Sequence, residues 1–258
     1  MNEQSVIFFD IDGTLLDHNK ELPVSTKEAI HELKRRGHFV AIATGRGPFM
    51  FKKIGDELGI DTFVSYNGQY VVVKGEVVYK NPMELASLEK LIQASVKNDH
   101  PIVFMDPNKM KANVPEHPYI TAGFSSLKVG TPTVDPLYYQ ENDIFQSLLF
   151  CEEGKEKQYE EEFPAFDFVR WHEVSVDVLP KGGSKAKGIE KVMEKLHIPN
   201  DRIYAFGDGL NDLEMLSTIE NSVAMGNGVD EVKEVAKYIT KPVDEDGILH
   251  GLKMVGLL

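Results

Sequence analysis

The sequence predicts an α/β fold in which a parallel sheet is interrupted by a second, inserted domain. Near both ends of the 258-residue chain, short apolar runs alternate with helical patterns, the order expected of parallel strands connected by helices. The middle differs, because the stretch from Pro82 to Pro180 holds nine of the 13 prolines and mixes strand-like runs with loops. Polar residues also follow several predicted strands, where α/β sheets place their ligands.

The first third of the chain has the pattern of a β-α-β-α-β unit. The continuous apolar run Val6–Phe9 is typical of a strand that is buried on both faces. Ser25 and Glu28 have capping-box spacing at the start of the next helix, and Gly37 ends it. The elements predicted here are strands at residues 6–9, 39–43 and 63–65 and helices between Pro23 and Gly37 and at residues 49–58.

The alternation resumes in the last third. Ser184 can cap a helix in which apolar residues from Ile189 to Leu196 recur at the spacing of one buried face. Before the middle segment, residues 71–73 and 77–79 flank a short turn and predict a hairpin. The remaining predicted elements are strands at residues 144–150, 174–179, 203–206, 222–225 and 238–240 and helices at residues 212–216 and 231–236.

The change of pattern predicts two domains, one inserted into the other. We expect residues 1–81 and 183–258 to form a core, and residues 82–182 to form the insert. The connections at Asn81-Pro82 and at residues 180–183 are rich in turn-forming residues. Each part is long enough to bury a core of its own.

Composition narrows the class of function. The chain has 28 basic and 41 acidic residues and a net charge of −13, which disfavours a nucleic-acid or anionic-membrane partner, since both need clustered Lys and Arg. No apolar run has the length of a membrane span, and the first residues lack the basic segment of a signal peptide. The single cysteine, Cys151, cannot form an internal disulfide. We therefore expect a cytoplasmic protein, whereas its oligomeric state cannot be read from the sequence.

Two carboxylates follow the first predicted strand. Asp10 and Asp12 point the same way if the chain stays extended, and Gly13 comes directly after them. Like charges this close repel each other unless a cation or a shared proton intervenes, and such oxygen ligands suit Mg²⁺. An ordinary strand-end turn explains the same residues about as well when they are considered alone.

Three further groups of polar residues follow other elements. The triplet Thr44-Gly45-Arg46 ends the second strand and offers a hydroxyl and free backbone N–H groups for a phosphate oxygen. Lys185 begins a helix, where the helix dipole disfavours a cation, so it suits a residue that neutralises an anion. The segment 207–212 follows a later strand with Asp208, Asn211 and Asp212. A turn or a solvated surface lysine is the simpler explanation for each signal by itself.

Together, in this order, these groups resemble the four motifs of the haloacid dehalogenase (HAD) superfamily of phosphatases. The long insert, the segment Ser65-Tyr66-Asn67-Gly68 and the segment 224–227 are similar to the Cof-type branch, which has a type IIB cap. The resemblance is strongest across residues 5–80 and 180–250. It implies a Rossmann-like parallel-sheet core with an inserted α/β cap, in which the cap selects the substrate.

The resemblance also implies roles for the residues that match its motifs. Asp10 would be the nucleophile that forms an aspartyl-phosphate, and Asp12 the general acid and base, for which its pKa should lie above that of an ordinary aspartate. Mg²⁺ would bind the carboxylates of Asp10 and Asp208 and the carbonyl oxygen of Asp12. Thr44 and Lys185 would hold the phosphate oxygens. The residues expected around the phosphate or behind these groups are Gly13, Gly45, Arg46, Asn211 and Asp212.

The sequence thus predicts a Mg²⁺-dependent phosphatase for small phosphorylated metabolites, such as sugar phosphates or nucleotide-like phosphates. The alternatives are a phosphomutase and a non-catalytic sensor of phosphorylated metabolites. A mutase is disfavoured because only residues 15–23 separate the first motif from the first helix, which leaves no room there for the usual small helical insert. A sensor is disfavoured because Asp10, Asp12 and Lys185 are all present.

Overall fold

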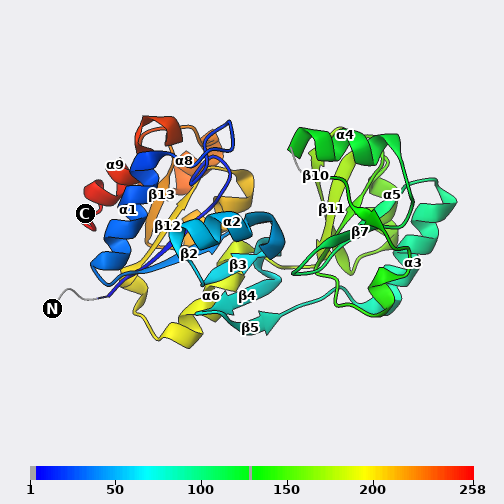
Figure 1. The fold of residues 1–258 in the computed structure, drawn as a ribbon, viewed down its shortest axis with the longest axis horizontal. Helices are drawn as coiled ribbons and strands as arrows, with labels where there is room; N and C mark the ends of the chain where they lie inside the picture. Colours follow the sequence, from blue (N-terminus) through cyan, green and yellow to red (C-terminus); the bar gives the residue numbers. More distant parts are fainter. Residues whose placement is uncertain (1–3, 128–129) are drawn as a thin grey trace. The chain divides into compact units, whose positions relative to one another are not determined.

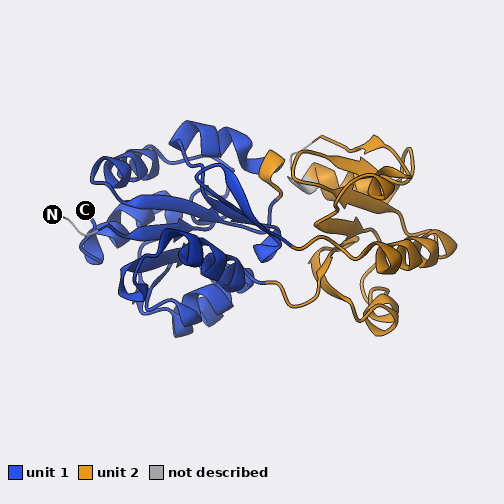
Figure 2. Cartoon of the chain, turned by 90° about the horizontal axis from the view of Figure 1, so that it is seen from below, with its two compact units in different colours: residues 1–46, 50–80, 184–258 blue, residues 47–49, 81–183 orange. Residues whose placement is uncertain are grey.

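A computed structural model describes residues 4–127 and 130–258 and divides the chain into two compact units (Figures 1 and 2). Unit 1 comprises residues 1–46, 50–80 and 184–258, and unit 2 comprises residues 47–49 and 81–183. Unit 2 is therefore inserted into the sequence of unit 1, apart from the three residues 47–49. Each unit is built around one sheet.

Unit 1 contains an eight-stranded sheet in the order β14-β13-β12-β1-β2-β3-β4-β5. The pairs from β14 to β3 are parallel, and β3, β4 and β5 pair antiparallel. The strands are β1 (Val6–Phe9), β2 (Phe39–Ala43), β3 (Phe63–Ser65), β4 (Tyr70–Val73), β5 (Glu76–Lys80), β12 (Ile203–Gly207), β13 (Asn221–Ala224) and β14 (Tyr238–Ile239). The predicted strands and the hairpin of this part are thus confirmed, with ends shifted by at most one residue.

Helices cover both faces of this sheet (Figure 1). They are α1 (Val24–Arg35), α2 (Pro48–Leu58), α6 (Lys185–Leu196), α7 (Leu213–Thr218), α8 (Asp230–Val235) and α9 (Gly247–Met254). Ile7 and Phe9 of β1 pack with the apolar residues of α1 and α9, whereas Val6 and Phe8 pack with those of α6, α7 and α8. The strand is therefore buried on both faces, which explains its continuous apolar run.

The two predicted helix caps have different outcomes. Ser184 caps α6, because its side chain accepts a hydrogen bond from the backbone N–H of Lys187 at 3.2 Å. The capping box at Ser25 and Glu28 is wrong. Pro23 occupies the N-cap position and places Ser25 inside the first turn, where its Oγ has no hydrogen-bond partner among the described residues. Spacing alone did not locate the first helical residue.

Unit 2 contains a six-stranded sheet in the order β10-β11-β9-β6-β7-β8. Its elements are α3 (Leu85–Lys97), β6 (Ile102–Met105), β7 (Met110–Ala112), α4 (Pro118–Leu127), β8 (Thr133–Val134), β9 (Gln146–Leu149), α5 (Lys157–Glu162), β10 (Phe166–His172) and β11 (Ser175–Pro180). The apolar residues of α3 and α5 pack on one face, against Phe104, Leu149 and Val178 among others. On the opposite face, Phe124 of α4 contacts Phe150, which follows β9.

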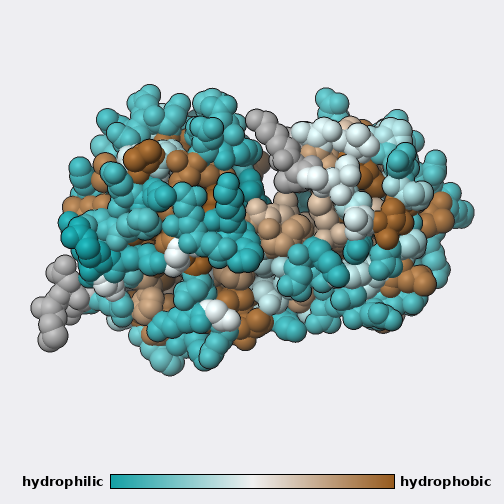
Figure 3. Space-filling view, in the orientation of Figure 1, coloured by the Kyte–Doolittle hydropathy of each residue, from teal (hydrophilic) through white to brown (hydrophobic). Residues whose placement is uncertain are grey.

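The outer surface is mostly hydrophilic. In the face shown in Figure 3, hydrophilic residues predominate and apolar side chains form small groups. The most exposed large apolar residues, such as Val24 and Val96, lie on different helices, which is ordinary for a folded protein surface. Among the described residues, no helix is both long and apolar enough to cross a lipid bilayer.

Candidate active site

Three polar side chains lie at the carboxyl ends of three neighbouring strands. Asp10 follows β1, Thr44 follows β2, and Asp208 follows β12, and β1 pairs with β2 on one side and with β12 on the other. The chain moves outward in one direction from β1 through β2 and β3, and in the other direction from β12 through β13 and β14. Asp10 therefore sits where the strand order reverses, which is the usual ligand site of an open α/β sheet.

Lys185 forms a buried ion-pair triad with two aspartates. Its Nζ donates to Asp10 Oδ1 at 2.5 Å and to Asp212 Oδ1 at 2.6 Å, and all three side chains are buried. Burial lowers the pKa of Lys185, but the two carboxylates outweigh this effect and raise it. For Asp10, burial raises the pKa to about 7; Asp212 and Asp208 also raise it, and Lys185 opposes them. One ammonium group thus faces more negative charge than it can neutralise.

The carboxylates of Asp10, Asp208 and Asp212 form a group whose ligand oxygens lie within 4.8 Å of one another. Asp208 is partly buried, and burial together with the nearby Asp212 and Asp12 raises its pKa to about 6, against the hydrogen bond from Thr14 and the charge of Lys185. Hard oxygen donors with raised pKa values are a suitable donor set for a small divalent cation. The residues present therefore fit a metal ion such as Mg²⁺.

Gly13 brings the first motif against this group. Its φ of +80° is readily adopted only by glycine, and a Cβ at this position would lie about 2.1 Å from Asp208 Oδ2. The next residue, Thr14, is buried and donates from Oγ1 to Asp208 Oδ1 at 2.9 Å. Asn227 donates to the Gly13 carbonyl oxygen at 2.8 Å and thereby joins the segment after β13 to the same loop. The close approach of the Gly13 backbone to the Asp208 side chain therefore requires a glycine, and the Thr14 hydroxyl holds the same carboxylate.

The environment of Asp12 corrects one prediction. Arg46 binds its carboxylate with two hydrogen bonds, from Nε at 2.7 Å and from Nη2 at 2.6 Å, and Lys20 Nζ adds a third at 2.5 Å. Burial raises the pKa of Asp12, but these two cations outweigh it and leave the pKa below that of an ordinary aspartate. The sequence-based expectation of a raised pKa was wrong, because it counted only the neighbouring carboxylates.

Thr44 and Gly45 form a tight turn after β2. Thr44 is buried, and its Oγ1 accepts a hydrogen bond from the Arg46 backbone N–H at 3.2 Å. A Cβ on Gly45 would lie 3.1 Å from the side-chain amide of Asn67, a tight contact. Asn67 has a left-handed backbone (φ 49°), and its buried Oδ1 has no hydrogen-bond partner among the described residues. An amide oriented in this way beside Thr44 and Gly45 is a candidate ligand contact.

Asp212 and Asn211 differ in their surroundings. Besides binding Lys185, Asp212 accepts hydrogen bonds through Oδ2 from the backbone N–H groups of Asp208 at 2.9 Å and Gly209 at 3.0 Å. It therefore fixes both the amine of Lys185 and the loop that carries Asp208. Asn211 is exposed, with its amide oxygen near Gly209. The structure brings together the other predicted residues and leaves Asn211 at the edge of the site.

Sequence reasoning did not select Thr14, Lys20 or Asn67 as functional residues. Thr14 belongs to the first motif, and Asn67 belongs to a segment that resembles the Cof-type branch, so a signal was present for both. Lys20 lies in a loop and has a positive φ of 65°, and nothing in its neighbourhood in the sequence connects it with Asp12. Its contact with Asp12 forms because the loop folds back toward the first motif.

Comparison with known proteins identifies the family. The sequence profile of the haloacid dehalogenase-like hydrolases matches residues 7–252. The Bacillus subtilis (strain 168) protein named "Putative phosphatase YkrA" is 52% identical over 256 residues, which are 99% of this chain and 99% of that protein. A hypothetical protein from Geobacillus kaustophilus HTA426, known from a crystal structure, is 55% identical with a TM-score of 0.97, over 99% of this chain and 100% of that one.

A further solved structure carries a description of its activity. The HAD subclass IIB sugar phosphatase BT4131 is 32% identical to this chain with a TM-score of 0.84, over 98% of this chain and 100% of that one. The chain therefore belongs to the haloacid dehalogenase-like hydrolase family. It is an enzyme of the phosphatase class, and the resemblance to the Cof-type, subclass IIB branch and the predicted α/β fold are confirmed.

Proposed function

We propose that this enzyme hydrolyses phosphate monoesters of small metabolites, with Mg²⁺ and through an aspartyl-phosphate on Asp10. The observation that carries the proposal is the position of the Asp10 carboxylate. It lies buried at the strand end where the sheet order reverses, held by Lys185 and close to Asp208. A carboxylate in such a place can act as a nucleophile toward phosphorus, while the groups around it bind the charge of the phosphoryl oxygens.

The proposed reaction has two steps. An Asp10 carboxylate oxygen attacks phosphorus, the bond between phosphorus and the alcohol oxygen breaks, and Asp12 gives that oxygen its proton. Water then attacks the phosphorus of the aspartyl-phosphate, Asp12 takes the proton of the water, and the Asp10 carboxylate leaves. Because Arg46 and Lys20 lower the pKa of Asp12, its carboxyl group carries a proton only after it leaves their hydrogen bonds.

The remaining site residues are proposed to hold the metal ion and the phosphate beside Asp10 and Asp12. The carboxylates of Asp10 and Asp208, and the carbonyl oxygen of Asp12, are the groups that would hold Mg²⁺. The ion would supply positive charge that reduces the repulsion of the nucleophile and the phosphate dianion. Thr44 and Lys185 are proposed to bind phosphate oxygens, with Gly13, Gly45 and Arg46 beside them. Asp212 keeps Lys185 in place through its 2.6 Å hydrogen bond. Asn211 is proposed to act only through water, since its side chain is exposed.

We propose that catalysis and substrate recognition belong to different parts of the chain. Residues 1–81 and 183–258 would form the catalytic core, and residues 82–182 the cap that recognises the alcohol part of the substrate. The boundaries rest on the compact units at residues 80/81 and 183/184. The free, buried Cys151 supports a cytoplasmic location. The match to the hydrolase family and to a relative named a phosphatase supports a small phosphorylated metabolite as the partner.

The test is release of inorganic phosphate from a panel of sugar phosphates and nucleotides, with Mg²⁺ and with EDTA. We expect Mg²⁺-dependent release by the native enzyme, and loss of turnover in Asp10→Asn, which keeps the size of the side chain. Asp244→Asn, an exposed carboxylate on unit 1, is the matched control and should remain active. Hydrolysis by Asp10→Asn at the native rate would contradict the proposal. Isomerisation of a substrate without release would indicate a mutase, and binding without either would indicate a sensor.

A further inference from the structure

Asn227 joins three loops at the carboxyl edge of the sheet in unit 1. It belongs to the segment 224–227, at the end of β13. Its Nδ2 donates to the carbonyl oxygen of Gly13, after β1, at 2.8 Å, and its Oδ1 accepts from the backbone N–H of Val243, after β14, at 2.8 Å. One amide therefore connects the ends of β1 and β14, which β12 and β13 separate in the sheet.

The two partners fix the orientation of this amide. A backbone carbonyl oxygen can only accept a hydrogen bond and a backbone N–H can only donate one, so Nδ2 must face Gly13 and Oδ1 must face Val243. Asn227 is an exposed residue, so a smaller side chain at this position leaves no cavity in the core. Substitutions of Asn227 therefore test its hydrogen bonds more than its packing.

The loop that Asn227 holds is the one that packs against Asp208. The backbone of Gly13 comes so close to Asp208 Oδ2 that a Cβ could not fit between them. Asn227 Nδ2 lies 3.5 Å from the same oxygen. Further along the loop after β13, the backbone N–H of Val229 donates to the carbonyl oxygen of Asp208 at 3.0 Å. Residues 227–229 thus contact both the side chain and the backbone of Asp208.

Each polar atom of Asp208 has a neighbour that restrains it. Its backbone N–H donates to Asp212, its carbonyl oxygen accepts from Val229, and its Oδ1 accepts from Thr14. Its Oδ2 has only the long contact with Asn227. A carboxylate offers about four lone-pair sites, so these contacts leave room for a cation. Groups that bind a metal ligand from behind in this way set its orientation and change the affinity for the metal.

We propose that Asn227 is a positioning residue that holds the Gly13 loop against Asp208 and thereby makes the metal site selective for a small cation. Mg²⁺ requires close oxygen ligands in a nearly fixed arrangement, whereas Ca²⁺ accepts longer distances and more flexible ligands. A Gly13 loop fixed by Asn227 therefore favours Mg²⁺, and a released loop weakens Mg²⁺ binding more than Ca²⁺ binding. This inference rests on the proposed function for the metal site and adds the residue that sets its ion preference.

Asn221 is the matched control, because it is an asparagine with a purely structural role. It begins β13, at the opposite end of the strand from the site, and its Nδ2 donates to the carbonyl oxygens of Asp201 at 2.9 Å and Ile203 at 3.3 Å. Asn221→Ala and Asn227→Ala both remove an amide that binds two backbone groups. Only Asn227→Ala releases the loop of the first motif.

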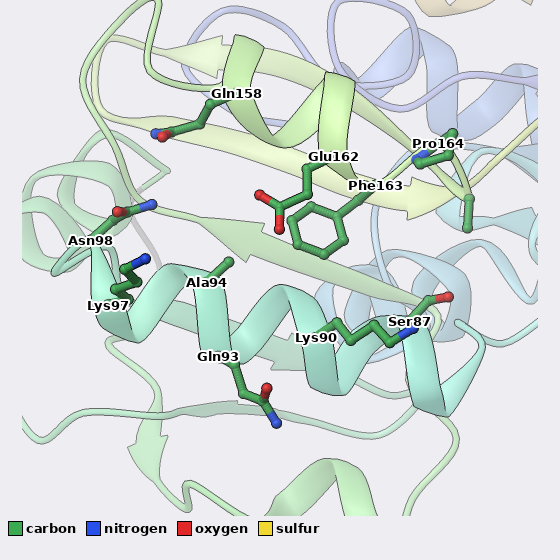
Figure 4. Close-up of a pocket in the computed structure, with 11 residues that line it drawn as sticks. Ser87, Lys90, Gln93, Ala94, Lys97, Asn98, Gln158, Glu162, Phe163 and Pro164 are labelled. Atoms are coloured by element: carbon green, nitrogen blue, oxygen red, sulfur yellow. The ribbon is translucent and has the colours of Figure 1, made fainter.

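A pocket of unit 2 provides a control for cations bound elsewhere on the surface (Figure 4). It lies between α3 and the end of α5, has a volume of about 630 Å³, and is lined by Lys90 and Glu162 among others. Both of these side chains are exposed. Among the described residues, Glu162 does not belong to the group of carboxylates that fits a metal ion. Glu162→Gln should therefore leave tight cation binding unchanged.

Metal binding can be measured without turnover. The full chain, freed of metal with EDTA and dialysed, is titrated with Mn²⁺ under electron paramagnetic resonance, and the bound Mn²⁺ is then displaced by Mg²⁺ or by Ca²⁺. In Asn227→Ala we expect the affinity for Mg²⁺ to fall about tenfold and the affinity for Ca²⁺ to fall by a smaller factor, so that the ratio of the two affinities decreases. Asn221→Ala and Glu162→Gln should bind both ions as the native chain does.

The outcomes separate this inference from the proposed function. Native Mg²⁺ affinity in Asn227→Ala, equal losses for Mg²⁺ and Ca²⁺, or the same loss in Asn221→Ala would overturn the inference and leave the metal site intact. A native chain that binds neither Mn²⁺ nor Mg²⁺ tightly would overturn both. Asn227→Leu, which is close to asparagine in shape and has no hydrogen-bonding group, should repeat the result of Asn227→Ala. Circular dichroism verifies that each variant is folded.

Discussion

Replacing Lys185 by methionine tests the buried triad most severely. The methionine side chain has a similar length and no charge, so the change removes the ammonium group and keeps most of the volume. Asp10 and Asp212 would then lie buried near each other without the Nζ that bridges them at 2.5 and 2.6 Å. Removing one partner of a buried ion pair costs about 3–5 kcal/mol of unfolding free energy, because the remaining charge is left uncompensated.

This cost corresponds to a large shift in the melting temperature. In a domain of about 150–250 residues, each kcal/mol lowers Tm by about 2–4 °C, so Lys185→Met should lower it by about 6–20 °C. The assay is circular dichroism during heating at pH 7 with EDTA, so that only protein groups contribute. Lys195→Met, which removes an exposed lysine from the same helix, should cost less than about 1 kcal/mol.

A double variant separates the charge effect from a packing effect. Asp212→Asn removes one of the two uncompensated charges while its side-chain oxygen can still accept from the backbone of Asp208. On the Lys185→Met background it should therefore recover about 1–3 kcal/mol, a coupling of the size found for residues in contact. A Tm for Lys185→Met within about 2 °C of the native value, or no recovery by Asp212→Asn, would refute the reasoning.

Three other predictions follow from the same geometry. Gly13→Ala should abolish Mg²⁺-dependent activity, measured as phosphate release, because its Cβ would collide with the Asp208 carboxylate, a proposed metal ligand; native activity would contradict the required close approach. Arg46→Ala should raise the apparent pKa of Asp12 in the pH profile of kcat with little change in KM, since it removes the two hydrogen bonds that keep this carboxylate ionised; a raised KM with an unchanged pH profile would show that Arg46 binds substrate instead. Hydrogen bonds from Arg170 lower the pKa of Glu156 to about 2, from 4.5. Because the folded pKa is depressed, this pair stabilises the protein above about pH 4.5, and the contribution disappears as the pH falls through about 2. Glu156→Gln should therefore lower Tm at pH 7 and lose that difference in acid, and an equal difference at both pH values would disprove the pair's role.

The strands and helices of unit 1 could be predicted because their signals are local. Val6–Phe9 is apolar at every position since both faces of the strand are covered, and the apolar spacing of α6 marks its buried face. The prediction of a capping box at Ser25 was wrong for a local reason as well. Pro23 has an extended backbone (ψ 141°) and is the N-cap, so the helix begins at Val24, two residues before Thr26, where a helix capped by Ser25 would begin.

The site was predictable where a motif lies next to a strand end. Asp10, Thr44 and Asp208 follow three adjacent strands, so the parallel topology alone brings them together. The state of Asp12 was not predictable, because it depends on Arg46 and on Lys20, whose loop folds back onto the first motif.

The central claim is that the phosphoryl group passes through the Asp10 carboxylate. Acid quenching of the native enzyme during turnover of its best substrate, followed by digestion and mass spectrometry, tests this claim most directly. We predict one phosphoryl group on the peptide that contains Asp10, absent from Asp10→Asn and absent when Mg²⁺ is removed. A known acyl phosphate, carried through the same quench, serves as the control that such a bond survives. If the enzyme then turns over without this label, or carries the label on a different residue, the account is contradicted.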